Sequence, residues 1–170
     1  MGELWDLLDE NGNKIGKLHE RGTPLAEAYY FLVVAVWIRN SKGEFLITRR
    51  AADKNHLWHT TGGCATAGDD SITAALRETK EEIGIDLNPD KAAFFKRTIR
   101  KRLEDDGLYF QDVWLFREDV DIAKIVLQPE EICDVMWASV EEIRQMIAEG
   151  RFVNPQEWYP QLDEFFEFCE

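Results

Sequence analysis

Runs of apolar residues alternate with short polar breaks along the chain, and their spacing predicts strands in the N-terminal third. Residues 4–19 form two short runs around Asn11-Gly12, a dipeptide that accepts positive φ, and this predicts a β-hairpin. A connector over 20–28 leads to the run 29–40, which is apolar on both faces, as in the central strand of a covered sheet. A second strand is expected at 44–50, followed by a polar loop.

The pattern changes to a helical period at residues 70–83. Five residues recur at i, i+3, i+4, i+7 and i+11 and build one buried stripe: Ile72, Ala75, Leu76, Thr79 and Ile83. Asp70 or Ser71 can cap the start of this helix, and Gly84 supplies the residue after its end. A helix over 70–83 is therefore the strongest local prediction.

The second half of the chain predicts a long hairpin, one more strand and two helices. The expected elements are strands at 92–103 and 108–118 around a turn at 104–107, a strand at 132–139, a helix at 140–150, and a C-terminal helix over about 155–168 with an aromatic face. No repeat, low-complexity segment or linker interrupts them. The sequence thus predicts one α/β domain, 1–170, with a mixed sheet covered on both faces by helices. The aromatic helix can cover its own core or a partner subunit in a homodimer.

Composition narrows the range of functions. The chain has 33 acidic and 20 basic residues among 170, a formal net charge of −13. Non-specific binding of nucleic acid needs a basic surface, so a nucleic-acid polymer is not an expected partner. An acidic chain also suits an anionic substrate poorly unless a divalent cation mediates, which is a first indication of a metal.

Other features predict a reduced, soluble, cytoplasmic protein. The three cysteines, Cys64, Cys133 and Cys169, are far apart and form no C-x-x-C motif. The N-terminus lacks the basic and apolar regions of a signal peptide. The longest apolar run, ten residues from Tyr29, is too short to span a bilayer, so no membrane partner is expected.

The candidate chemistry lies on the predicted helix. Glu78 and Glu82 are one turn apart, and Glu81 is at i,i+3 from Glu78, so three carboxylates converge on one rim. Such hard oxygen ligands suit Mg²⁺ or Mn²⁺. The pair Gly62-Gly63 allows close approach of the backbone, and a carbonyl there can be another ligand. The alternative is a solvated acidic helix face.

These residues resemble a known family. Over residues 63–85 the chain matches the spacing of a known signature at Gly63, Asp69, Arg77, Glu78, Glu81, Glu82, Gly84 and Ile85. This signature is that of the Nudix hydrolases. The resemblance implies a Nudix fold, an α/β/α sandwich with a mixed β-sheet. It also implies attack of water on phosphorus in a diphosphate linked to another moiety. Two positions depart from the signature: Asp69 replaces the usual Glu, and Thr79 an aliphatic residue.

The resemblance also implies roles for individual residues. In the family the helix glutamates hold one or more divalent cations, here Glu78, Glu81 and Glu82, joined by the carbonyl of Gly62. The arginine of the signature, Arg77, orients the carboxylates by ion pairing. The general base varies among members; Glu131 is the candidate and Glu130 the second choice, and a surface loop acid is the alternative for both.

The N-terminal hairpin resembles the branch of the family that contains the isopentenyl-diphosphate isomerases, which transfer a proton at an alkene. Those enzymes carry Cys-Gly-His where this chain has Gly62, Gly63 and Cys64, and Tyr30 stands where a metal-binding histidine is expected. The isomerase activity is therefore disfavoured. A third hypothesis is a Nudix-fold sensor that binds a ligand with little turnover, and the substitution at Asp69 is its basis.

Basic and aromatic residues are candidates for binding a small-molecule diphosphate such as a nucleoside diphosphate derivative. Arg49, Arg50 and Arg100 are the predicted diphosphate-binding residues; strand alternation puts Lys96, Arg100 and Arg102 on one face and Arg97 and Lys101 on the other. The alternative for these cations is a charged strand edge that resists aggregation. The aromatic residues Trp5, Tyr29, Trp58 and Tyr109 can stack a base or pack in the core. His56 and His59 are expected near the mouth of the pocket.

Overall fold

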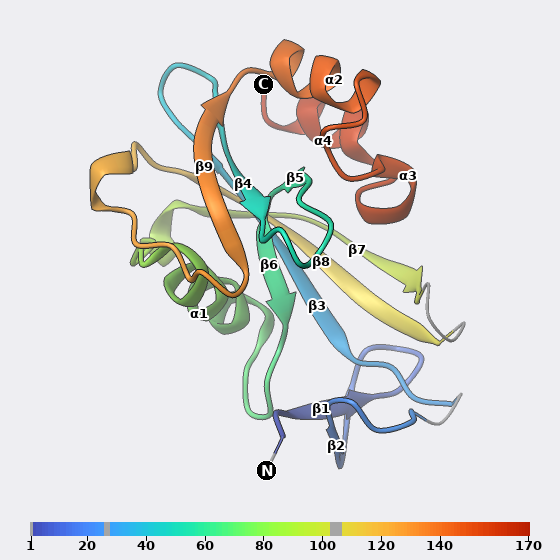
Figure 1. Cartoon of the computed structure of the whole chain (residues 1–170). Coiled ribbons are helices and arrows are strands. Elements are labelled where there is room, and N and C mark those ends of the chain that lie inside the picture. The colour runs from blue at the N-terminus through green and yellow to red at the C-terminus, as the bar shows by residue number, and fades with distance from the viewer. Residues whose placement is uncertain (1, 26–27, 103–106) are drawn as a thin grey trace.

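A computed structural model describes residues 2–25, 28–102 and 107–170 (Figure 1). The elements are β1 (Leu4–Leu8), β2 (Lys14–Glu20), β3 (Leu32–Arg39), β4 (Phe45–Arg50), β5 (Trp58–His59), β6 (Thr61–Cys64), α1 (Ser71–Ile83), η1 (Pro89–Lys91), β7 (Ala92–Lys101), β8 (Leu108–Arg117), η2 (Ile122–Lys124), β9 (Ile132–Ala138), α2 (Val140–Ala148), α3 (Pro155–Trp158) and α4 (Leu162–Phe168). No helix of the described residues is long and apolar enough to cross a membrane. The predicted turn at 104–107 lies outside the described residues except for Gly107, as do residues 26–27 of the predicted connector.

The strands form two sheets. β1 and β2 make a small antiparallel hairpin, as the sequence predicts. The other seven form one sheet with the order β5-β4-β3-β8-β7, in which β6 also pairs with β3 and β9 with β4. β3 and β8 are parallel, whereas the remaining pairs are antiparallel. The sheet is therefore mixed, with β3 at its centre.

Alternation along β3 divides the core between the two faces of this sheet. Val34 and Val36 point to one face and pack in a cluster that includes Ala75 of α1. Ala35 and Trp37 point to the other face and pack in the cluster formed with α2 and α4. Figure 1 shows α1 on one side of the sheet and α2, α3 and α4 on the other. The α/β/α sandwich predicted from the sequence is confirmed.

The C-terminal segment differs from its prediction. A single helix over 155–168 was expected, but α3 and α4 are separate helices with a break at Tyr159 and Pro160. A residue before proline is pushed out of the helical region, and Tyr159 has φ −141° and ψ 65°. The aromatic face covers the protein's own sheet, since Phe165 and Phe166 are buried in the core.

The strands β5 and β6 are not predicted by the sequence pattern. The loop expected at 51–61 contains β5, which pairs with β4, and the glycine pair that follows lies within β6. Glycine weakens a strand pattern but permits close approach of another backbone. A Cβ atom on Gly62 would collide with the carbonyl oxygen of Val34 on the neighbouring strand β3. This glycine therefore brings β6 into the sheet at the point where α1 crosses it.

Candidate functional site

Local sequence signals set the position of α1, which carries the candidate catalytic residues. The helix begins after Asp70, whose side chain accepts a hydrogen bond from the N–H of Thr73 at 2.9 Å. It ends at Gly84, which has φ +71° and donates its N–H to the carbonyl of Lys80. Thr79 is fully buried in the stripe, and its hydroxyl donates to the carbonyl of Ala75. The polar substitution at Thr79 is therefore satisfied inside the helix.

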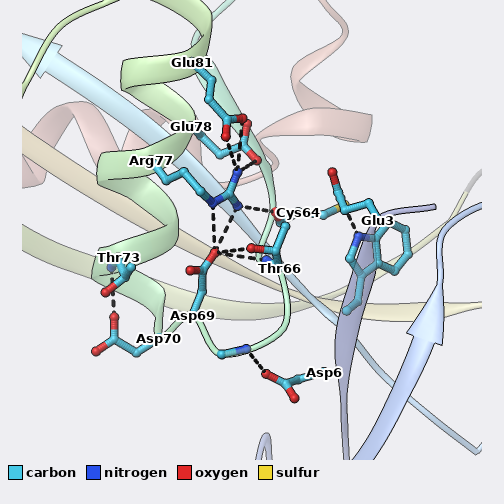
Figure 2. Close-up of polar contacts among 12 residues, drawn as sticks. Glu3, Asp6, Cys64, Thr66, Asp69, Asp70, Thr73, Arg77, Glu78 and Glu81 are labelled. Carbon is cyan, nitrogen blue, oxygen red and sulfur yellow. Dashed lines mark hydrogen bonds and ion pairs between the residues drawn. The ribbon is translucent and has the colours of Figure 1, made fainter. Parts of the chain in front are cut away.

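Arg77 is the centre of the polar contacts around α1, as Figure 2 shows. Its guanidinium donates to Asp69 at 3.0 Å, to Glu78 at 3.1 Å and to Glu81 at 3.2 Å. A further N–H donates to the carbonyl of Cys64 on β6 at 3.0 Å. Burial lowers the pKa of Arg77, but Glu78, Asp69 and Glu81 outweigh it and hold the pKa above its ordinary value. The predicted pairing of Arg77 with the carboxylates is present in the structure.

Asp69 takes part in this arrangement through the loop before α1. One oxygen of its carboxylate accepts hydrogen bonds from both the N–H and the hydroxyl of Thr66, at 3.0 and 2.9 Å. The same oxygen accepts the bond from Arg77. Asp69 thus fixes both the loop 65–70 and the guanidinium, and the shorter side chain still reaches its partner.

Glu78 lies against the glycine pair of β6. A Cβ atom on Gly63 would lie 2.5 Å from the carboxylate carbon of Glu78, so only glycine leaves room for this side chain. Burial raises the pKa of Glu78 to about 7, although the charge of Arg77 opposes this rise. The carboxylate is therefore desolvated and held next to a backbone strand.

Glu82 is buried, whereas the helix periodicity placed it on an open rim. Its side chain accepts a hydrogen bond from the N–H of Gly62. Its second oxygen, Oε2, is buried without a hydrogen-bond partner among the described residues. Burial, and next the charge of Glu78, raise the pKa of Glu82 well above its ordinary value. A buried carboxylate oxygen without a partner is costly, and a bound cation would remove this cost.

The donor chemistry of Glu78, Glu81 and Glu82 suits a divalent metal ion, because carboxylate oxygens are hard ligands. The backbone of Gly62 lies beside Glu82. Within the described ranges, however, no three acidic, histidine or cysteine side chains lie close enough together to hold a metal ion. Glu78 and Glu81 are instead paired with Arg77. The unpartnered oxygen of Glu82 nevertheless favours a cation at this position.

The structure places Glu131 near the end of α1. Its carboxylate pairs with Lys54 at 2.6 Å, and its charge contributes to the raised pKa of Glu82. The loop that carries it is tied to the helix, since the N–H of Gln128 donates to the carbonyl of Glu82 at 2.9 Å. Glu130 is exposed. Of the two candidate bases, Glu131 is thus the one whose charge raises the pKa of a helix carboxylate, Glu82.

The three arginines predicted to bind diphosphate have different partners. Arg49 donates to the carbonyl of His56 at 3.0 Å, and Arg50 lies over the ring of Trp158 at 4.9 Å from its centroid. Arg100 donates to the carbonyl of Glu157 at 2.5 Å, at the end of α3.

The histidines of the loop before β6 differ in their surroundings. His56 is exposed and adopts a φ of +59°. His59 is buried, with its ring against that of Trp158 at 5.8 Å between centroids. Burial lowers the pKa of His59 to about 3, so its ring is neutral.

A cleft of about 510 Å³ opens beside Cys64, the residue whose carbonyl bonds Arg77. It is bordered by the N-terminal hairpin, β3, β6, the β7–β8 hairpin and α3. Its lining residues are Trp5, Arg21, Gly22, Phe31, Val33, Cys64, Lys101, Arg102, Tyr109, Gln111, Glu157 and Trp158.

The cleft contains residues that the sequence did not point to. Of the aromatic candidates, Tyr109 and the largely buried Trp5 line it, whereas Trp58 is buried in the core and Tyr29 contacts Lys17 on the hairpin. Arg21 and Trp158 were not singled out, because no local pattern connects the distant segments that carry them.

Comparisons with known proteins identify the family of the chain. The family model for the NUDIX domain matches residues 30–162. An uncharacterised Nudix hydrolase of Listeria monocytogenes is 37% identical over 157 residues, which cover 89% of this chain and 88% of that protein. The chain therefore belongs to the Nudix hydrolases, enzymes that act on small molecules and generally use divalent metal ions.

More distant similarities extend to another reaction and to the fold. An isopentenyl-diphosphate Delta-isomerase of Citrobacter koseri is 24% identical over 152 residues, covering 86% of this chain and 83% of that protein. The crystal structure of DR0079 from Deinococcus radiodurans matches with a TM-score of 0.70 at 23% identity, and the match covers 98% of this chain and 99% of that one. The latter similarity supports the Nudix fold.

Proposed function

We propose that this protein uses Mg²⁺ or Mn²⁺ to hydrolyse a diphosphate linkage in a nucleoside diphosphate derivative. The observation that carries the proposal is the pair of desolvated carboxylates, Glu78 and Glu82, packed against the glycines of β6. One of their oxygens has no partner among the described atoms, although it is buried. Such an arrangement is unfavourable for a merely structural surface and favourable for binding a cation.

Each residue of the site has a distinct task in the proposed reaction. Glu78, Glu81, Glu82 and the carbonyl of Gly62 hold the cation, which when bound neutralises phosphoryl oxygens and lowers the pKa of water. Arg77 orients Glu78 and Glu81 through the bonds of 3.1 and 3.2 Å. In this proposal Glu131 accepts the proton of the attacking water.

The cleft supports a substrate with a planar aromatic group. Tyr109 and Trp158 are partly exposed on its walls, and the buried rings of Trp5 and Phe31 lie behind them. Aromatic rings of this kind stack on a base. Arg49, Arg50 and Arg100 are retained as proposed contacts of the diphosphate. Arg50 lies over the ring of Trp158 and Arg100 donates to the carbonyl of Glu157, and both of these partners line the cleft.

Two other functions are open to test. The isomerase has support from the relative in Citrobacter koseri, but Gly62 has no side chain at the position that resembles the isomerase cysteine. The sensor hypothesis was based on Asp69, and in the structure that residue supports Arg77 by accepting its hydrogen bond. This observation favours an enzyme over a sensor.

A substrate screen tests the proposal. Nucleoside triphosphates, dinucleoside polyphosphates, nucleotide sugars and coenzymes are assayed for phosphate or nucleotide release with Mg²⁺ and with Mn²⁺. Glu82→Gln is expected to lower turnover by about a hundredfold or more, because it removes an anionic oxygen from the metal position. Glu167→Gln, at an exposed carboxylate on α4, is the matched control and keeps full activity.

The same screen separates the alternatives. Binding of a ligand by calorimetry without product release would support the sensor, and conversion of isopentenyl diphosphate would support the isomerase. Equal turnover by the wild type and by Glu81→Gln and Glu82→Gln would show that the metal assignment is wrong.

A further inference from the structure

The N-terminal hairpin is fixed to the loop that precedes the catalytic helix. The N–H of Ala67 donates to the carbonyl of Leu4 at 2.8 Å, and the N–H of Gly68 donates to the carboxylate of Asp6 at 2.8 Å. The ammonium group of Lys14 donates to the carbonyl of Asp69 at 2.9 Å. Asp6 and Lys14 also pair with each other at 2.8 Å. Figure 2 shows Asp6 below the loop that ends in Asp69. The hairpin is therefore tied to the loop 65–70 that leads into α1, so a group on the hairpin has a defined position relative to the carboxylates of this helix.

Three cations from two distant segments line the cleft near Cys64: Arg21, Lys101 and Arg102. Arg21 follows the last strand of the hairpin, and Arg102 follows β7. Cys64 lines the same cleft, and its carbonyl accepts a hydrogen bond from Arg77, which also donates to Glu78. The two arginines therefore share a cleft with the residue that joins β6 to the catalytic helix.

The immediate surroundings of the two arginines suit an anion. Arg102 lies over the ring of Phe31 at 5.4 Å, and Phe31 stacks on Trp5 at 4.6 Å and on Tyr109 at 5.5 Å. This aromatic wall gives the guanidinium a rigid support. Among the residues that the structure describes, the side chain of Arg21 pairs with Glu3 at a long distance of 3.8 Å, and it is 61% exposed. Such a pair contributes little, so Arg21 can turn towards an anion at low cost.

Two of the arginines favoured by the sequence do not line the cleft. Arg49 donates to the carbonyl of His56, and Arg100 donates from outside to the carbonyl of Glu157 in the cleft wall. Arg77 donates to three carboxylates and a carbonyl. In a chain with a net charge of −13, an anionic substrate needs cations at the binding surface itself.

We propose that Arg21 and Arg102 bind the diphosphate of the substrate from the two sides of the cleft, which makes the N-terminal hairpin part of the substrate-binding site. This inference rests on the proposed function, since it assumes a diphosphate at the carboxylates. The planar guanidinium matches two phosphate oxygens in a bidentate contact. The hairpin, anchored on residues 67–69, sets the distance between Arg21 and the metal-binding carboxylates.

Calorimetry with inorganic diphosphate and Mg²⁺ tests the inference. Arg21→Ala and Arg102→Ala are each expected to weaken binding about tenfold, because each removes a charge-assisted hydrogen bond. In turnover assays the same variants raise KM and leave kcat nearly unchanged, and Arg21→Lys and Arg102→Lys recover part of the affinity. Thermal unfolding verifies that each variant is folded.

Matched controls remove the same charge elsewhere. Lys17 lies on the same hairpin and donates to the hydroxyl of Tyr29, and Lys91 lies beside Glu118; neither residue lines the cleft. The control variants are Lys17→Ala and Lys91→Ala. Both are expected to bind inorganic diphosphate within twofold of the wild type, since a distant charge is screened. Equal losses in the controls and in the cleft variants would show that only net charge matters and would overturn the inference.

The outcomes also separate this inference from the proposed function. If no substrate is hydrolysed but diphosphate binding depends on Arg21 and Arg102, the binding site stands and the hydrolase proposal fails. If Glu82→Gln abolishes turnover while Arg21→Ala and Arg102→Ala retain wild-type binding and KM, the function stands and this inference fails. Absence of diphosphate binding by the wild type also overturns the inference.

Discussion

At the scale of single residues, Arg77 explains how three glutamates are tolerated on one helix. Its guanidinium contacts Glu78 and Glu81 and so offsets their mutual repulsion in the metal-free protein. Asp69, the departure from the family signature, accepts a bond from Arg77 and two from Thr66. The shorter carboxylate therefore retains a positioning contact that holds the signature arginine over the helix.

Substitution of Asp69 tests that role. Asp69→Ala is expected to lower the free energy of unfolding by about 2 kcal/mol, because Arg77 and Thr66 lose a shared acceptor in a partly buried place. Urea denaturation measures the change. Asp86→Ala removes an aspartate that is 82% exposed and paired with Lys80, and a change within about 0.5 kcal/mol is expected there. Similar values for both variants would refute a structural role of Asp69.

The pKa of Glu78 predicts how stability depends on pH. Its folded-state pKa of about 7 lies above the ordinary value of 4.5, so between these values the folded protein binds more protons than the unfolded chain. Metal-free protein should therefore lose stability as pH rises from about 5 to about 7, by about 2 kcal/mol. Denaturant titrations in the presence of a chelator measure this slope, and Glu78→Gln should flatten it. A stability that rises over the same range would contradict the prediction.

At the scale of elements, the strand β6 and the helix α1 form the site together. Gly62 allows the backbone of β6 to approach β3, and Gly63 leaves room for the carboxylate of Glu78. The two glycines thus have different tasks, one within the sheet and one towards the helix.

Alanine at these two positions should separate the tasks. Gly62→Ala meets a backbone carbonyl that cannot move without shifting β3, and a loss of about 3 kcal/mol in unfolding free energy is expected. Gly63→Ala meets the end of a side chain, so the loss is expected to be about 1 kcal/mol, but Mg²⁺ binding should weaken because Glu78 is displaced. Urea denaturation and metal titration by calorimetry measure the two effects; the reverse order would be inconsistent with this geometry.

The sequence predicts an element well when its signals are local. The helix α1 has a cap, a stripe and a terminal glycine within one segment, and it spans Ser71–Ile83 as expected. β6 is missed because its glycines oppose a strand pattern, although tertiary contacts require them. The burial of Glu82 is not predicted either. Periodicity indicates which face of the helix a residue occupies, but it does not indicate how deeply β6 covers that face. The place of Arg21 in the cleft depends on packing between segments that are far apart in sequence.

At the scale of the whole molecule, one ion pair of the large sheet lies against the turn of the small hairpin. Asp112 on β8 is 1% exposed and accepts two bonds from Arg97 on β7, at 2.6 and 2.8 Å. The guanidinium of Arg97 also lies next to Gly12 in the turn of the N-terminal hairpin and over Phe110 at 5.2 Å. The pair therefore lies where the two sheets meet.

Removal of one partner from this pair should be costly. Arg97→Ala is expected to lower the free energy of unfolding by about 2–3 kcal/mol, because Asp112 is left buried with an unpaired charge. The double variant Arg97→Met with Asp112→Leu should recover most of this loss, since the buried charge is then absent. Arg144→Ala breaks an exposed pair and serves as the control, with a change of about 0.5 kcal/mol or less. Urea denaturation distinguishes these values. A double variant whose loss of unfolding free energy equals the sum of the two single losses would contradict the explanation.

The parallel pairing of β3 with β8 determines when the site can assemble. Leu32 pairs with Phe110, and β6, α1 and β7 all lie in the stretch of chain between these partners. The hairpins β1–β2 and β7–β8 are local and can form early, whereas joining β3 to β8 closes a long loop and is slow. The glutamates of α1 contact β6 only within that loop. On refolding, catalytic activity should therefore return with the last cooperative phase, after most of the helical signal in circular dichroism has returned.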